Sequence, residues 1–173
     1  MNNQYKILGL FLVSFLILGL AVYVSWLPAD GNRLSRFGDR PLVNVYWGNS
    51  QFDTEVTCIR VFPIERQVSG SMNEVGLAQF ARWAVEQLLQ GPTETEQSRD
   101  NLTSLPQGVV IQQLEIQNGQ ARVDFSSKLE QGVGGSYRVA AIRAQITETL
   151  KQFPGVARVI ISVDGRVEDA LQS

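Results

Sequence analysis

The chain has 173 residues, with 15 Lys and Arg against 17 Asp and Glu and no His, so its formal net charge is −2. This length fits one domain plus a small appendage, and the slightly acidic balance argues against nucleic-acid binding, which needs a basic face. Without His, and with Cys58 as the single cysteine, Ser-His-Asp and Cys-His catalysis are excluded and the usual transition-metal site cannot be built. We therefore expect no metal and no cofactor, and we interpret Cys58 as a small buried strand residue.

The first 40 residues differ in composition from the rest of the chain. Residues 7–27 form an uncharged apolar stretch of about 21 residues, enough at ~1.5 Å per helical residue to cross a hydrocarbon layer ~30 Å thick. The alternative, a cleavable signal peptide, usually has only about 7–15 apolar residues, so we favour an uncleaved anchor. Residues 1–27 are thus assigned to a cytoplasmic tail and transmembrane anchor, and the turn-rich residues 28–40 to a linker.

The charged residues on either side of the apolar stretch bear on the orientation of the anchor. Lys6 precedes the apolar stretch and Arg33, Arg36 and Arg40 follow it, so a Lys and Arg count alone would keep the domain inside. Long C-terminal domains are translocated largely regardless of charge, and the amino-terminal tail is very short. We expect a single-pass protein whose C-terminal domain lies outside the cytoplasmic membrane.

The folded part is expected to begin near Pro41 with two strands. Residues 42–47 alternate in polarity, which places Val43, Val45 and Trp47 on the buried side. Residues 55–62 are a second strand candidate, which should end at Pro63 or lie at a sheet edge, because proline cannot donate a ladder hydrogen bond.

A first helix is predicted to start at a capping box formed by Ser71 and Glu74 and to end at Gly91-Pro92. Trp83 lies at the border of the apolar stripe, where packing at the edge of the core is favoured over a contact surface. The stripe itself consists of Leu77, Phe80, Ala81, Ala84 and Leu88.

A β-hairpin is predicted for residues 109–117 and 120–125, because Asn118-Gly119 between them is a strong signal for a type I′ turn. A two-residue loop pairs Gln117 with Gln120. The register then sets Glu115 against Arg122, as opposite charges across the ladder, and Gln112 against Phe125.

A second helix is predicted for residues 136–152, followed by Pro154-Gly155 and a last strand over residues 156–163, with Val159, Ile161 and Val163 facing the helices. The apolar stripe of this helix continues to Phe153, and Asp164-Gly165 turns the chain out after the strand. The residues expected on the opposite, exposed face of the helix are Ala141, Gln145 and Glu148.

The predicted order is strand, strand, helix, strand, strand, helix, strand. This order is typical of an α+β fold in which a small mixed sheet carries two helices on one face, here preceded by one transmembrane helix.

Three groups of residues are candidates for a site. The loop of residues 132–136 opens a helix and could hold an anion, but a tight loop with a Ser136 cap explains the same residues more simply. Asp124 and Asp164 are candidates for a two-carboxylate hydrolase, yet nothing in the sequence brings them together. Glu94 and Glu96 are interpreted as a solvated, helix-starting turn. No catalytic residue is expected.

Five motifs occur in a fixed order: Leu88-Leu89-Gln90-Gly91-Pro92, Val123-Asp124-Phe125-Ser126, Gly134-Gly135-Ser136, Gln152-Phe153-Pro154-Gly155-Val156 and Val163-Asp164-Gly165. Together they resemble the sporulation and spore germination domain GerMN over residues 41–167, which leaves residues 168–173 as a C-terminal tail. The resemblance implies a compact βαββαβ unit similar to ring-building motifs, an extracytoplasmic location and a non-catalytic role. The recurring positions, expected to be structural, are Gly91, Pro92, Gly135, Ser136, Phe153, Pro154, Gly155, Asp164 and Gly165.

These observations favour a membrane-anchored interaction module that binds envelope proteins or a second copy of itself, as a subunit or scaffold of a cell-envelope complex. Contacts would use sheet edges or exposed helix faces. The alternative is a module that binds a glycan or muropeptide of peptidoglycan through exposed aromatic residues. Trp47 and Trp83 are the candidate contact residues, with Tyr46 and Phe52 as further members of such a stripe.

Overall fold

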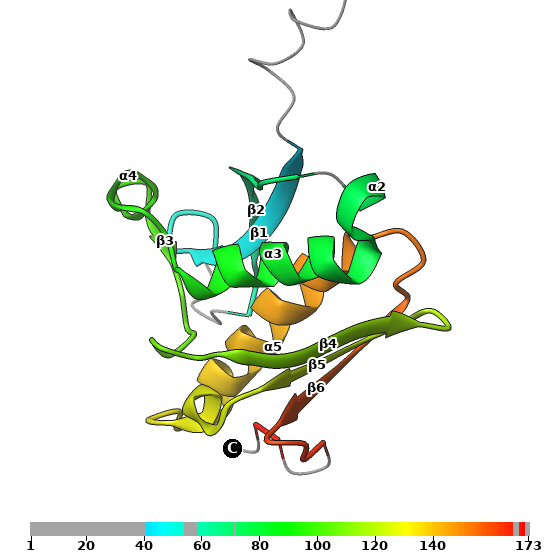
Figure 1. Ribbon diagram of the computed structural model, residues 1–173. Helices are drawn as coiled ribbons and strands as arrows, with labels where there is room; N and C mark the ends of the chain where they lie inside the picture. Colours follow the sequence, from blue (N-terminus) through cyan, green and yellow to red (C-terminus); the bar gives the residue numbers. More distant parts are fainter. Residues whose placement is uncertain (1–40, 54–58, 71, 168–169, 172–173) are drawn as a thin grey trace, which may run out of the picture. The chain divides into compact units, whose positions relative to one another are not determined.

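The computed structural model describes residues 41–53, 59–70, 72–167 and 170–171 (Figure 1). The predicted anchor and linker lie outside these residues, as does Cys58. Within the described ranges, no helix has the length and apolar character needed to cross a membrane.

The strands form two three-stranded sheets rather than the single mixed sheet predicted from the sequence. The first sheet is antiparallel with the order β2-β1-β3, and the second has the order β4-β5-β6 with β5 and β6 parallel. The first sheet consists of β1 (Leu42–Asn49), β2 (Phe62–Gln67) and β3 (Asn101–Leu102). The second consists of β4 (Ile111–Gln117), β5 (Gln120–Phe125) and β6 (Arg158–Val163).

Two long helices connect the sheets. α3 contacts β1 and β4, α5 contacts β1 and β6, and the two helices pack against each other (Figure 1). The predicted first helix is divided, because Gly76 takes a φ of 83° between α2 and α3, a conformation that glycine adopts at little cost. The helices are α2 (Met72–Val75), α3 (Leu77–Leu89), α4 (Glu94–Gln97), the 3₁₀ turn η1 (Ser127–Glu130) and α5 (Ser136–Lys151).

The predicted capping box at the start of the first helix falls partly outside the described residues, because Ser71 is not among them. The other end is confirmed: α3 ends at Leu89, and Gly91 follows with a φ of 76°.

One apolar core joins both sheets and both long helices. The predicted buried side of β1 is confirmed, and most of the predicted helix stripes lie in this core, although Leu77 is only half-buried. Fully buried members include Val45, Trp47, Ala84, Leu88, Val123, Phe125, Ile142, Ile146, Leu150 and Val163.

The predicted exposed face of α5 is wrong for two of its three residues. Ala141 and Gln145 are buried, with 0% and 1% of their surface exposed, whereas Glu148 is half-buried. The reason is that α5 contacts strands of both sheets and is therefore covered on more than one side.

On the side of β1 that faces away from β2, backbone groups hydrogen-bond to polar side chains of α5 and of its C-terminal cap residue. The Asn44 amide donates to Gln152 Oε1 at 2.8 Å, and Gln152 Nε2 donates back to the Asn44 carbonyl at 2.7 Å. The Tyr46 amide donates to Thr149 Oγ1 at 3.2 Å. The Gln152 amide group thus makes the pair of bonds that a neighbouring strand would make.

Gln145 has the same role about two helical turns before Gln152, beside the chain that follows β3. It accepts from the Ser104 amide and donates to the Leu102 carbonyl, both at 3.3 Å. Side chains therefore stand in for a further strand along the first sheet, which explains why the six strands do not merge into one sheet.

The second strand lies later in the chain than predicted. β2 begins at Phe62 and runs through Pro63, whereas residues 59–61 are not in a strand and residues 54–58 lie outside the described ranges. The amides of Asn44 and Tyr46 point to α5, so Pro63, the partner of Tyr46 in the register, falls between ladder bonds with its nitrogen turned outward. Proline is tolerated at such an edge position.

The hairpin is confirmed near its turn and differs at its far end. Asn118 and Gly119 both have positive φ, 50° and 77°, as a type I′ turn requires, and Glu115 lies opposite Arg122. The register shifts between Ile111 and Gln113, so Ile111 rather than Gln112 lies opposite Phe125. This bulge buries Ile111 and leaves Gln112 exposed.

Replacing Gln152 with Leu removes both bonds to the Asn44 peptide group while keeping a side chain of similar size. We expect the free energy of unfolding to fall by about 1–3 kcal/mol, because a partly buried donor and acceptor lose their partners. Urea denaturation of Gln152→Leu measures this, with Gln79→Leu at an exposed position of α3 as the matched control. An equal loss in both variants would contradict the assigned role.

Candidate functional site

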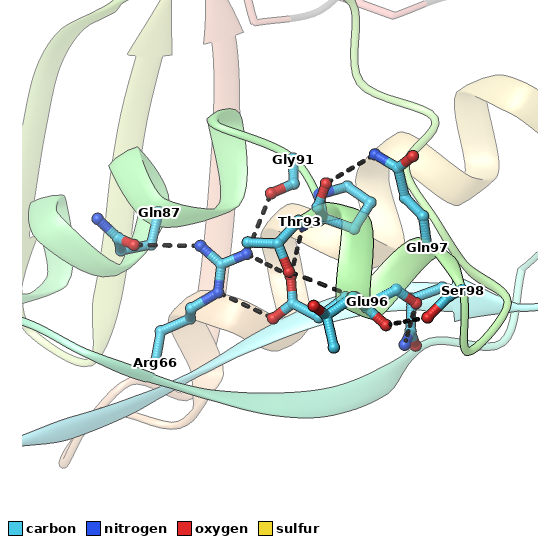
Figure 2. A network of polar contacts seen from close by, with 10 residues as sticks. Arg66, Gln87, Gly91, Thr93, Glu96, Gln97 and Ser98 are labelled. Atoms are coloured by element: carbon cyan, nitrogen blue, oxygen red, sulfur yellow. Dashed lines mark hydrogen bonds and ion pairs between the residues drawn. The ribbon is translucent and has the colours of Figure 1, made fainter.

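Gly91 and Pro92, the first family-motif positions, lie where α3 ends and α4 begins. The Gly91 carbonyl accepts from Arg66 Nη2 at 3.1 Å, and Arg66 Nη1 donates to Gln87 Oε1 at 3.3 Å (Figure 2). The Pro92 carbonyl accepts from Gln97 Nε2 at 2.8 Å. Both motif residues therefore fix the path of the chain, and Arg66 connects that path to β2.

Arg66 and Glu96 form a two-pronged ion pair that is mostly buried. Arg66 Nε donates to Glu96 Oε1 at 3.0 Å and Nη2 to Oε2 at 2.6 Å, with side chains only 14% and 15% exposed (Figure 2). The Thr93 amide and hydroxyl also donate to Glu96 Oε2, which completes a capping box for α4. On its other side, the Arg66 guanidinium lies 4.9 Å from the centre of the Trp47 ring.

The interpretation of Glu96 as a solvated residue is therefore wrong, whereas Glu94 is exposed as expected. Partial burial acts to raise the pKa of Glu96, but the hydrogen bonds from Arg66 and Thr93, together with the Arg66 charge, act in the other direction. Their combined effect holds the pKa of Glu96 below its ordinary value of 4.5.

Replacing Glu96 with Gln should lower the free energy of unfolding at pH 7 by about 1–3 kcal/mol, because Arg66 loses its charged partner. Glu94→Gln on the same turn is the matched control and should change stability little. Because the folded-state pKa of Glu96 is lowered, its contribution is complete above pH 4.5 and is lost as pH falls through the folded-state value.

Denaturation curves of the native protein and Glu96→Gln, taken from pH 7 downward, should therefore converge at acid pH. A difference that stays constant across this range would show that the ionised form of Glu96 is not what stabilises the fold.

The start of β6 lies beside the hairpin turn and follows the motif Phe153-Pro154-Gly155. The buried Phe153 ring meets Phe80 edge-on, with centroids 6.1 Å apart, and Gly155 takes a φ of 78°. Beyond this turn, the amides of Ala157 and Arg158 both donate to the Gly119 carbonyl, at 2.9 and 3.1 Å. These contacts align β6 with the tip of β5.

Gly135 and Ser136 open α5, but not through the predicted serine cap. Gly135 is the N-cap residue, with a φ of 90°, and Ser136 is already the first helical residue. The loop is held instead by Arg138, whose Nη1 donates to the Gly132 carbonyl at 2.9 Å. The glycine is required here for its backbone conformation.

Asp164 and Gly165 form a two-residue turn, with φ values of 46° and 78°, that leads out of β6. The parallel pairing of β5 and β6 brings Asp124 to this turn, which the sequence could not show. Asp124 Oδ1 accepts from the Gly165 amide at 2.9 Å and from the Ser162 hydroxyl, while Asp164 Oδ1 accepts from Gln112 Nε2 at 2.8 Å. Both carboxylates bind groups of the protein itself.

The two tryptophan candidates have different surroundings. Trp47 is fully buried, so its assignment to a contact surface is wrong; it lies on the core side of β1, opposite the half-buried Tyr46. Trp83 is half-buried and meets the Phe80 ring edge-on at 6.2 Å, in agreement with packing at the edge of the core. Phe52 is 59% exposed. These four residues therefore do not form one exposed aromatic stripe.

The second sheet has an outer face of mixed polar and apolar side chains, on which no helix or strand of the described residues packs. A shallow depression of about 430 Å³ lies on it, and in the described part of the chain no group of three His, Cys, Asp or Glu side chains is placed to hold a metal. Sequence reasoning noted the polar alternation of these strands but did not identify their outer face as a site. The depression is lined by Gln113, Glu115, Arg122, Val123, Asp124, Ile160, Ser162, Gly165 and Val167.

Two edge strands border this face, β4 on one side and β6 on the other. The far end of β4 is covered by Arg82, whose Nη2 donates to the Ile111 carbonyl at 2.7 Å. The far end of β6 is covered by Arg166, which exchanges two backbone hydrogen bonds with Val163. Among the described residues, none hydrogen-bonds to the outward backbone groups in the middle of either edge strand.

Comparison with known proteins identifies the family. The family model described as "Germane: Sporulation and spore germination" matches residues 44–169. The chain belongs to the Germane family. This confirms the resemblance drawn from the five motifs. No curated protein matches this chain.

Solved structures show the same Germane fold. The first GerMN domain of the sporulation protein GerM from Bacillus subtilis matches with a TM-score of 0.56 and 19% identity, over 75% of this chain and 86% of that one. The tandem GerMN domains of the same protein match with a TM-score of 0.52 and 17% identity, over 76% of this chain and 42% of that one. At these identities the similarity concerns the fold alone.

Proposed function

We propose that this Germane-family protein is a non-catalytic interaction module, anchored by residues 7–27 and displayed outside the cytoplasmic membrane as a subunit or scaffold of an envelope complex. Its partners are envelope proteins, and the outer face and edges of the second sheet are the contact region. The observation that carries this proposal is the sheet β4-β5-β6, of which the helices cover only one face and whose two outer strands have open central segments.

The polar chemistry of the described domain supports a non-catalytic role. The carboxylates of Asp124, Asp164 and Glu96 are engaged in hydrogen bonds that position turns, strands and α4. A hydrolytic pair would need one carboxyl group to protonate a leaving group and another to activate water or act as nucleophile. Groups that already hold the backbone are poorly suited to that work.

The character of the sheet face also suits a protein partner. It combines three charged side chains with the apolar Ile160 and the half-exposed Val167. The charged residues are Glu115, Arg122 and Asp124. Mixed polar and apolar surfaces of this kind are ordinary for non-obligate protein interfaces. The aromatic stripe that would favour glycan binding is broken by the burial of Trp47.

Crosslinking of the full-length protein in native membranes tests the proposal. A photoreactive side chain in place of Gln113, on the sheet face, should yield discrete protein adducts that mass spectrometry can identify. The same side chain in place of Gln79, on the exposed face of α3, is the matched control. Adducts only with wall fragments would favour the glycan alternative, and cleavage of peptidoglycan by the purified protein would refute a non-catalytic role.

The proposed orientation predicts that a protease added to intact spheroplasts digests the C-terminal domain, because this domain is exposed on the outer side. A cytoplasmic marker protein followed in the same samples verifies that the membrane stays sealed. Digestion that occurs only after the membrane is opened would place the domain inside.

A further inference from the structure

We propose that the second sheet binds a second copy of this chain, through antiparallel pairing of β4 in one copy with β6 in the next. The inference rests on the proposed function and specifies the partner of the same surface. It follows from the direction of the backbone groups at the two edges, from the side chains that accompany them and from their charges.

The outward groups of β4 are fixed by the hairpin register. A two-residue turn makes Gln117 and Gln120 a hydrogen-bonded pair, and strict alternation makes Glu115 and Arg122 the next such pair. The backbone N–H and C=O groups of Leu114 and Ile116 therefore point away from β5. In the described chain no other residue donates to or accepts from them.

The outward groups of β6 are fixed by its two ends. The Arg158 amide bonds to Gly119 and the Asp164 amide bonds to Phe125, so the even-numbered residues of β6 face β5. The odd-numbered residues point outward. The backbone groups of Val163 bind Arg166, and no described residue hydrogen-bonds to the outward groups of Val159 and Ile161.

The two open segments fit each other. β4 is antiparallel to β5 and β6 is parallel to it, so β4 and β6 run in opposite directions in each copy. A copy placed head-to-tail therefore presents its β6 antiparallel to β4. Both pairs of outward residues are engaged when Leu114 lies opposite Ile161 and Ile116 lies opposite Val159.

Side chains in this register match on both faces. Leu114, Ile116 and Val159 are half-buried at the rims of the core, and pairing would cover them with apolar neighbours. On the outer face, Glu115 would lie opposite Ile160 and diagonal to Arg158. These are the single acidic residue of β4 and the single basic residue of β6, so the charges are complementary.

Charge also disfavours symmetric pairing through β4. Pairing β4 with β4 of another copy in the corresponding register would set Glu115 directly against Glu115, which is destabilising. Pairing β4 with β6 instead uses two different edges, so the contact is heterologous and can be repeated from copy to copy.

Disulfide trapping between two single-cysteine proteins tests this pairing. Glu115 and Ile160 would form a non-hydrogen-bonded pair with Cα atoms about 4.5 Å apart, a separation that a disulfide accepts. Full-length Glu115→Cys and Ile160→Cys proteins, each also carrying Cys58→Ser and a different tag, are produced together in native membranes. We expect a mixed disulfide dimer under mild oxidation, and none when Gln79→Cys replaces Glu115→Cys.

A charge exchange gives a second readout that does not depend on cysteine reactivity. With chemical crosslinking of the full-length protein, Arg158→Glu should lower the yield of self-adducts roughly two- to five-fold. The double exchange of Glu115→Arg with Arg158→Glu should restore it. Both residues are exposed, so neither variant should unfold the domain.

The outcomes separate this inference from the proposed function. If no mixed disulfide forms but the photoreactive side chain at position 113 captures other proteins, self-pairing is overturned and the proposed interaction module stands. Neither disulfide nor protein adducts would overturn both. A mixed disulfide together with restored crosslinking in the double exchange would establish the β4–β6 contact.

Discussion

The fold depends on how the backbone N–H and C=O groups of one buried strand are hydrogen-bonded. β1 lies against both long helices, and its peptide groups need partners on both sides because burying them unpaired costs free energy. β2 supplies one side. On the other side, β3 pairs with the end of β1, and the groups of Asn44 and Tyr46 bind Gln152 and Thr149, more than a hundred positions later in the chain. Because a helix occupies this edge, no strand of the second sheet can join the first.

The ion pair between Arg66 and Glu96 extends this arrangement to the segment between α3 and β3. Arg66 stands on β2, covers the Trp47 ring and binds both the Gly91 carbonyl and the carboxylate of α4. It therefore ties a strand, the end of one helix and the start of another to a single guanidinium group. Arginine suits this position because its planar fork donates in several directions at once.

Periodicity and turn chemistry predicted most elements of the fold, because those signals are local. The Asn118-Gly119 turn set the hairpin register correctly from Leu114 to Gln117, and the residues of the apolar stripe predicted for the second helix are all buried. That stripe consists of Val139, Ile142, Ile146, Leu150 and Phe153. The division into two sheets could not be predicted, because it depends on hydrogen bonds from Gln145 and Gln152 to distant backbone groups. Polar residues on a helix usually face water, so sequence alone does not indicate that Gln145 and Gln152 bind the backbone of the first sheet.

The site could be predicted only to a limited extent, for a related reason. The motif residues were expected to be structural, and each lies at a turn or cap that directs the chain. The meeting of Asp124 with Gly165 and the exposure of two strand edges arise from the parallel pairing of β5 with β6. The order of strands in space is a property of the whole fold that no short motif carries.

Pro63 disfavours the addition of a further strand to the outer edge of β2. Its nitrogen sits at an outward position of β2 and carries no hydrogen, and the charged Glu65 follows it on the same edge. The opposite side of the first sheet is occupied by α5 and by a strand of only two residues. The outer edge of β2 thus offers one backbone donor fewer than a regular edge strand, so the addition of a strand there is less favourable.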